Sequence, residues 1–163
     1  MSRIYTVPFS ATVTAAGGNT DLWELKPADD KPIKLCAMRL SQYSEVGDAA
    51  EEGLSISIIR MTATVTDAAG TGSTAVTPVP MDSAGAASGF AAIVNSPTVA
   101  TTSGTTTTLE ELGWNERNTP CDFWYPDDEY MPKVKQGEAL LIRMNTTLAD
   151  DMSFSGVLWV KEE

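Results

Sequence analysis

The chain has 163 residues, a length typical of a single domain. Its 42% hydrophobic and 20% charged residues are close to globular averages, which excludes a wholly disordered or collagen-like chain. Histidine is absent, so Ser-His-Asp and Cys-His catalysis and imidazole metal sites are excluded. The 22 acidic and 11 basic residues give a net charge of −11, which disfavours nucleic acids and anionic membranes as partners.

The cysteines and the N-terminal sequence point to a protein used without secretion. Cys36 and Cys121 form no CxxC motif and are too few for a cysteine zinc site. Cys36 lies in an alternating apolar run and is expected in the core. The sequence leaves open whether the two thiols form a disulfide. The start of the chain has no long apolar leader, and no stretch approaches the roughly 18 apolar residues of a membrane span.

The first part of the chain alternates apolar and polar residues with the period of β-strands. In residues 3–14 the apolar side chains occupy every second position, as a half-buried strand requires. Further strands are predicted at 22–26, at 33–42 and at 54–66. Gly, Asn, Asp and Pro residues separate the first three of these runs and favour turns.

Residues 67–104 differ in composition from the rest of the chain. They are rich in Ala, Gly, Ser and Thr and offer few large apolar side chains to a core. We predict one β-sandwich domain spanning 1–163 in which 67–104 is a low-complexity insertion or arm, with short strands near 76–81 and 90–94. A mobile surface loop and an ordered arm lying on a neighbouring subunit are the two alternatives for it.

The last third returns to β-strand sequence. Residues 105–112 favour a strand, with a short helical turn at 109–112 as the alternative. Two strong runs at 139–146 and 152–160 are expected to pair as an antiparallel hairpin. About eight strands with little helix predict an all-β fold, an antiparallel β-sandwich of jelly-roll-like type.

Acidic clusters are the first candidates for chemistry. They lie at 29–30, 45–52, 127–129 and 150–151, and 127–129 is the densest candidate for a hard cation such as calcium. None has EF-hand spacing, and acidic turns are usually just solvated. Paired carboxylates could serve a glycosidase, but any acid-rich chain contains such pairs. We therefore predict no enzyme activity, no metal and no cofactor.

Aromatic residues concentrate between 114 and 130, among prolines and asparagines. One interpretation is that one or two rings cap an end of the sandwich. A second is a protein interface, where Trp, Tyr and Arg dominate binding energy. A third is a sugar-binding platform. We expect Arg117 and Arg143 to form either exposed ion pairs within the chain or ion pairs across a subunit boundary.

Four short motifs resemble a known class of proteins. They are Arg3-Ile4-Tyr5-Thr6-Val7, the turn at 26–32, the acidic segment at 45–49 and Gly137-Glu138-Ala139-Leu140. They look like small structural proteins of tailed-bacteriophage heads, in particular capsid decoration or cement proteins. The resemblance implies a β-sandwich trimer, made in the cytoplasm of a bacterial host, that clamps neighbouring major capsid subunits on the virion surface.

The resemblance names no contact residue, so candidates come from exposed or aromatic positions in the N-terminal segment, the acidic segment and the aromatic segment. The candidates for the capsid or subunit interface are Arg3, Tyr5, Glu45, Asp48, Trp114, Arg117, Trp124 and Tyr125. The alternative function is a carbohydrate- or receptor-binding β module of a tail or head fibre, in which the aromatic segment would bind sugar.

Overall fold

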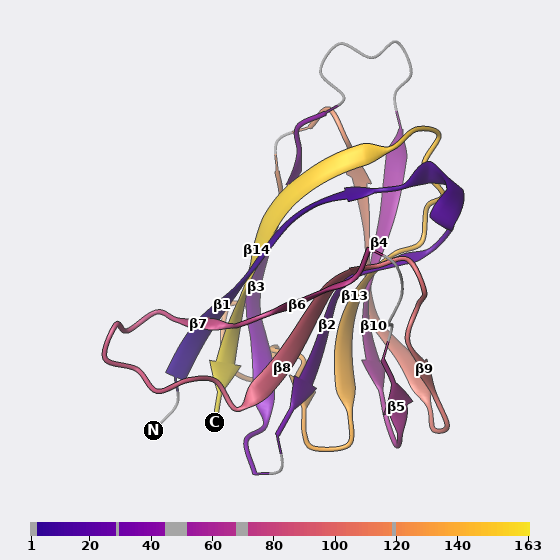
Figure 1. Ribbon diagram of the computed structural model, residues 1–163. Helices are drawn as coiled ribbons and strands as arrows, with labels where there is room; N and C mark the ends of the chain where they lie inside the picture. Colours follow the sequence, from indigo (N-terminus) through magenta and orange to yellow (C-terminus); the bar gives the residue numbers. More distant parts are fainter. Residues whose placement is uncertain (1–2, 29, 45–51, 68–71, 119) are drawn as a thin grey trace.

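The computed structural model describes residues 3–28, 30–44, 52–67, 72–118 and 120–163 and folds them almost entirely into strands (Figure 1). One helical element lies among these residues, the single 3-10 turn η1 (Ala15–Gly17). The strands are β1 (Arg3–Val13), β2 (Thr20–Pro27), β3 (Ile33–Gln42), β4 (Gly53–Met61), β5 (Val65–Thr66), β6 (Thr74–Val76), β7 (Val79–Pro80), β8 (Phe90–Ser96), β9 (Thr101–Thr102), β10 (Thr106–Asn115), β11 (Cys121–Trp124), β12 (Lys133–Val134), β13 (Ala139–Met144) and β14 (Met152–Glu162).

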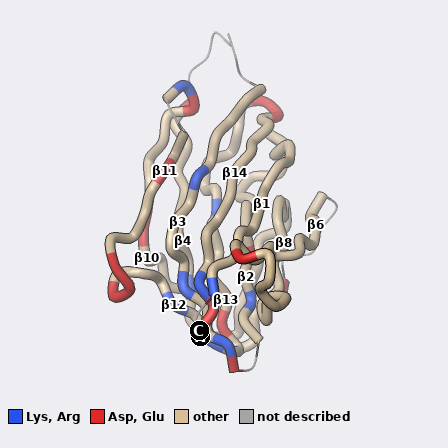
Figure 2. The backbone as a smooth tube through the Cα atoms, turned by 90° about the vertical axis from the view of Figure 1, so that its left-hand side faces the viewer, with Lys and Arg blue, Asp and Glu red and all other residues tan. Residues whose placement is uncertain are grey.

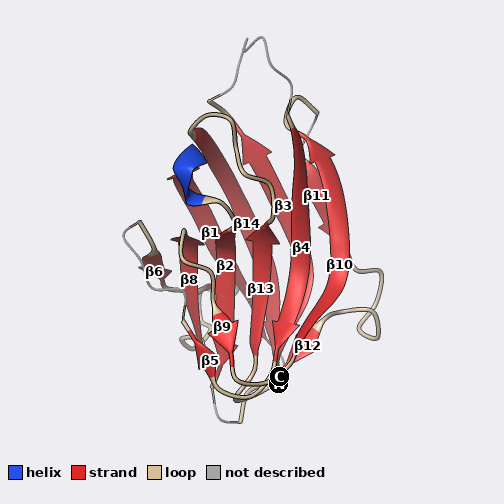
Figure 3. Cartoon of the chain, turned by 90° about the vertical axis from the view of Figure 1, so that its right-hand side faces the viewer, coloured by secondary structure: helices blue, strands red, loops and turns tan. Residues whose placement is uncertain are grey.

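Two antiparallel sheets face each other. Sheet A has the order β11-β3-β14-β1-β7, with β12 also paired to β3, and sheet B has the order β10-β4-β13-β2-β8-β6. Figure 2 looks onto sheet A and Figure 3 onto sheet B, where the small β5–β9 pair lies in front. The predicted all-β antiparallel sandwich is confirmed.

The core lies between the sheets because each long strand turns alternate side chains inward. On β1 the inward residues are Tyr5, Val7, Phe9 and Val13, all buried. Trp23 of β2 fills the centre: its ring packs against Phe9 at 5.0 Å between centroids, and its indole N–H donates to the Val7 carbonyl at 3.2 Å. A Cβ at Gly156 would lie 3.0 Å from this Trp23 ring, so glycine permits the close packing.

The predicted hairpin between 139–146 and 152–160 is wrong. Strand β13 pairs with β2 and β4 in sheet B, whereas β14 pairs with β1 and β3 in sheet A. The connection between the two strands therefore crosses from one sheet to the other. Alternation determines which face of a strand is buried, and the buried faces of both strands meet in the same core, so alternation alone does not assign a strand to a sheet.

Two strand predictions differ in detail. The run at 54–66 is divided, because β4 ends at Met61 and Val65–Thr66 form β5 against β9. Residues 106–115 form the single strand β10, which excludes the helical turn at 109–112. Its register to β4 shifts at Leu109, a β-bulge in this strand.

Much of the Ala- and Thr-rich segment is integrated into the chain's own fold. Strand β8 pairs with β2 in sheet B and buries Phe90, Ala92 and Val94. On the outer face of sheet B, a second small core forms where the β5–β9 region covers the sheet; its members are Ile59, Met61, Ala100, Ala139 and Leu141. The described part of 67–104 therefore packs mainly on sheet B, and β7 joins the edge of sheet A by pairing with β1.

Candidate interaction surface

The outer face of sheet A presents a row of side chains that crosses five of its six strands. Trp124 of β11 lies opposite Ala37 of β3, which lies opposite Trp159 of β14. Trp159 lies opposite Thr6 of β1, and Thr6 lies opposite Val79 of β7. We call these five residues the tryptophan row. Because every pairing is in register, the row is a continuous band across the sheet.

The two indoles meet above Ala37. Neighbouring strands lie about 4.8 Å apart, so β11 and β14 are separated by two such spacings with β3 between them. The ring centroids of Trp124 and Trp159 are nevertheless only 4.9 Å apart, with the ring planes inclined by 35°. A small side chain at position 37 leaves the rings room to touch, and Ala37 is fully buried beneath them. Trp124 remains 59% exposed.

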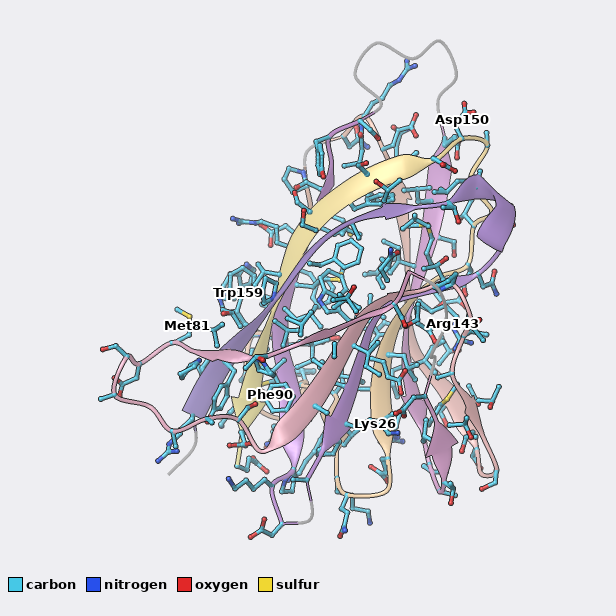
Figure 4. The ribbon with its side chains drawn as sticks, in the orientation of Figure 1. Lys26, Met81, Phe90, Arg143, Asp150 and Trp159 are labelled. Atoms are coloured by element: carbon cyan, nitrogen blue, oxygen red, sulfur yellow. The ribbon has the colours of Figure 1, made fainter. Side chains whose placement is uncertain are left out.

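Apolar surface continues from the row to the β7 edge. Ile4, Val79 and Met81 are all exposed there, and the Met81 N–H donates to the Ile4 carbonyl at 2.9 Å. Figure 4 shows Trp159 and Met81 on the same side of the sandwich. A shallow pocket of about 270 Å³ opens beside them, lined by Ile4, Pro80, Met81 and Gly85 among others. An exposed apolar patch of this kind is typical of an interaction site.

A belt of charge borders the row at the end of the sheet near the chain termini. Three lysines lie side by side on β12, β3 and β14, in the order Lys133, Lys34, Lys161. Like charges directly opposite each other repel, so this arrangement needs counter-charges. Asp128 pairs with Lys34 and Lys161, and Glu163 pairs with Lys34 and Lys133.

This network shifts the ionisation of its members. Hydrogen bonds from Lys161 and Lys34 lower the pKa of Asp128 to about 2. Hydrogen bonds from Lys133 and Lys34 lower the pKa of Glu163, and the same carboxylates raise the pKa of Lys34. Asp128 belongs to the acidic cluster predicted as the best cation site, and in the fold two ammonium groups occupy its oxygens.

The aromatic segment is split between three environments. Trp114 is buried in the core near Phe154, at 6.3 Å between centroids. Phe123 and Tyr125 pack edge to face at 5.4 Å and close the side of the sandwich where β10 and β11 end the two sheets. Burial of the hydroxyl, with the Glu110 carboxylate beside it, raises the pKa of Tyr125. Only Trp124 of these residues joins the tryptophan row.

The predicted interface residues are therefore scattered. The prediction for Tyr5 and Trp114 is corrected, because at 0% and 8% exposure their side chains are packed in the core and present little or no surface to a partner. Arg3 is exposed at the start of β1, and Arg117 is exposed in the turn after β10. Tyr125 is half-buried at the sandwich edge, and Trp124 lies on the face of sheet A. Glu45 and Asp48 lie outside the described residues.

Sequence reasoning missed Trp159, Val79 and Met81, whereas Ile4 lies in the N-terminal segment from which candidates were taken. The sequence did contain a signal for Trp159. It lies an odd number of residues from the buried Phe154 and Leu158 on the same strand, which places it on the outer face. No comparable signal exists for Val79 and Met81, because their place beside β1 depends on a pairing between segments more than 70 residues apart in sequence.

The rest of the described chain offers little chemistry. Within the described ranges no three Cys, Asp or Glu side chains converge as metal ligands. Both cysteines are free thiols, and burial raises the pKa of each, which disfavours the reactive thiolate. Arg143 forms its ion pair within the chain, with Asp21.

Comparisons with family models, with curated proteins and with solved structures found no match to this chain. Among the described residues no helix has the length and apolar character needed to cross a membrane.

Proposed function

We propose that this chain is a structural protein of a tailed-bacteriophage virion that binds the outside of the assembled capsid and bridges major capsid subunits as a trimer. The observation that supports it most is the tryptophan row with the adjoining exposed Ile4 and Met81. Large exposed aromatic and sulfur-containing side chains are typical anchors of protein interfaces.

The strand order also favours this function. Eight of the strands occupy the two sheets in the orders β11-β3-β14-β1 and β10-β4-β13-β2, as expected for a jelly roll made of two Greek keys. Residues 62–105, with β5 to β9, form an insertion between the fourth and fifth of these eight strands. Viral capsid proteins and lectins both use jelly rolls, so this support is an analogy of fold.

A trimer explains how such a surface could stabilise a shell. A ligand that binds the assembled lattice more tightly than free subunits shifts the equilibrium toward the lattice. Three copies of the tryptophan row on one trimer add avidity to contacts that are individually weak. The net charge of −11 keeps the free protein soluble at high copy number.

The test is co-sedimentation with expanded empty capsids of the phage whose genome encodes the chain. We expect saturable binding to shells, no binding to unassembled capsid subunits and a solution mass of three chains. Trp124→Ala should weaken shell binding. Tyr130→Ala is the matched control, because Tyr130 is comparably exposed, at 66% against 59%, but has no ring partner in the described structure. A monomer that does not bind shells would overturn the proposal.

The alternative, a carbohydrate-binding module, has one specific observation in its favour. The exposed indole of Trp124 lies next to Asp122 on the same strand, and Asp122 pairs with Arg39 at 2.6 Å. A flat ring beside charged hydrogen-bonding groups suits a sugar. Glycan-array binding that Trp124→Ala abolishes, in a protein that does not bind shells, would favour this function.

A further inference from the structure

Strand β10 is an edge of sheet B with one side unpaired. Its only strand partner among the described residues is β4, with which it pairs over its whole length. Sheet A ends on the same side in β11, which has four residues and, in the described part of the chain, pairs with β3 alone. A ten-residue edge strand in this position presents backbone donors and acceptors to the surroundings.

The register identifies which backbone groups are free. The Thr62 N–H donates to the Thr105 carbonyl at 3.0 Å, and the Glu116 N–H donates to the Glu52 carbonyl at 3.3 Å. In an antiparallel pair, the backbone N–H and C=O groups of alternate residues point to the same neighbouring strand, and the bulge at Leu109 shifts this alternation by one residue. The backbone groups of Leu112 and Trp114 therefore point to β4. Those of Thr106, Thr108, Glu111 and Gly113 point outward, away from β4.

The outer face of sheet B beside this edge is sterically open. A Cβ at Gly113 would meet no atom within 4 Å. The opposite edge of the sandwich is protected in comparison. There β1 carries Pro8, which has no N–H to offer, and the Thr12 carbonyl accepts from the Asn95 side chain at 3.2 Å. No such protection covers Glu111 and Gly113 in the described structure.

The open edge is acidic. Residues 105–116 contain no lysine or arginine, and of their three glutamates Glu111 is exposed whereas Glu116 is buried. Within the described part of the chain, Glu111 forms no ion pair. The Glu110 carboxylate lies beside the Tyr125 hydroxyl. A second copy of the chain would bring the same carboxylates to this edge, and like charges on paired strands repel.

We propose that the β10 edge binds an extended basic segment of a partner protein, which adds to sheet B as a further antiparallel strand. The backbone groups of Glu111 and Gly113 would hydrogen-bond the added strand, and Glu111 would pair with its lysine or arginine side chains. Recognition of this kind takes its affinity from the backbone and its specificity from the flanking side chains. The inference does not depend on the tryptophan row, which lies on the other sheet.

The test uses a short capped peptide of alternating lysine and valine with the full-length chain, measured by fluorescence anisotropy and by amide hydrogen exchange. We expect saturable binding and new protection of the Glu111 and Gly113 amides. The Leu112 and Trp114 amides should be protected both with and without peptide, because they are already hydrogen-bonded to β4. Two control peptides are the glutamate–valine counterpart and the lysine–valine peptide methylated at alternate backbone nitrogens, and neither should bind.

Variants separate charge from backbone pairing. Glu111→Lys should weaken binding about tenfold, since it replaces an attractive cross-strand pair with a repulsive one. Asp150→Lys makes the same change of charge at an exposed site in the connection before β14 and should leave binding unchanged. Equal binding of the methylated peptide, or no binding at all, would overturn the proposal. The proposal would also be overturned if the Glu111 and Gly113 amides were protected from hydrogen exchange without peptide and this protection rose with protein concentration. The strand bound at the edge would then belong to a second copy of the chain.

Discussion

Arg143 of β13 forms a bidentate ion pair with Asp21 of β2 on the outer face of sheet B: Nε lies 2.5 Å from Oδ1 and Nη2 lies 3.1 Å from Oδ2. Asp21 is 1% exposed, and its Oδ2 also accepts the Ala100 N–H at 2.7 Å. The Arg143 side chain in turn donates to the Ala100 carbonyl at 3.2 Å. One ion pair thus joins two strands of the sheet to the segment that covers them.

Breaking this pair should be costly. Asp21→Asn removes the counter-charge of an arginine that is largely buried, and we expect a loss of about 3–5 kcal/mol in the free energy of unfolding. The exposed pair of Arg39 and Asp122 is the control, and Asp122→Asn should cost about 0–1 kcal/mol. Urea denaturation of both variants measures the difference. Equal losses would contradict a structural role of the Asp21 pair.

The contact between Trp124 and Trp159 should be visible in solution. Trp124→Ala removes one ring of the pair, and we expect a loss of about 0.5–1.5 kcal/mol of stability. The near-ultraviolet circular dichroism should change because the two indoles no longer couple. Tyr130→Ala, at 66% exposure and without a ring partner among the described residues, should leave stability unchanged. An unaltered spectrum in the Trp124 variant would mean that the rings do not stack.

Two glycines provide a test of the packing. A Cβ at Gly156 would lie 2.5 Å from the Arg39 carbonyl oxygen, which belongs to the backbone and cannot swing away. Gly156→Ala should therefore destabilise the fold by about 1–3 kcal/mol. Gly113→Ala, with open space at its Cβ, should preserve or slightly raise stability. Comparable melting temperatures for the two variants would contradict the close approach of β14 and β3.

Asp128 should make stability depend on pH. Its pKa falls from 3.8 to about 2 on folding, so the unfolded chain binds the proton more tightly. The carboxylate therefore stabilises the fold above pH about 3.8, and this contribution disappears as the pH falls towards about 2. Wild type should resist urea better than Asp128→Asn at neutral pH, and the two midpoints should converge in acid. A gap that persists at pH about 2 would exclude the lysine pairs as its cause.

Sequence patterns predicted the local structure well and the partners of each strand poorly. The bounds of β3 and the inward face of β1 follow from alternation and flanking turns. The sheet to which β13 and β14 belong does not, because both strands bury one face in the same core. The residues of the connection between them do not distinguish the two arrangements either, because a connection of this length can close a hairpin or cross between sheets.

The candidate surface was predicted only in part, for the same reason. Trp124 was singled out for its aromatic neighbourhood, yet Trp114, only ten positions away, lies in the core. The partner of Trp124 is Trp159, which becomes its neighbour because β11 and β14 both pair with β3. Such a contact depends on the strand order of the whole sheet, and no local window of sequence contains it.

The position of β14 has a consequence for biosynthesis. It lies between β1 and β3 in sheet A, although the ribosome makes it after both. The two earlier strands have no direct pairing to each other, so sheet A cannot be completed until residues 152–162 have been synthesised. Completion of this sheet is therefore expected to be slow, because its pairings have a high sequence separation. Until then the apolar face of β1 is incompletely covered, and such exposed surface favours aggregation when the chain is overproduced.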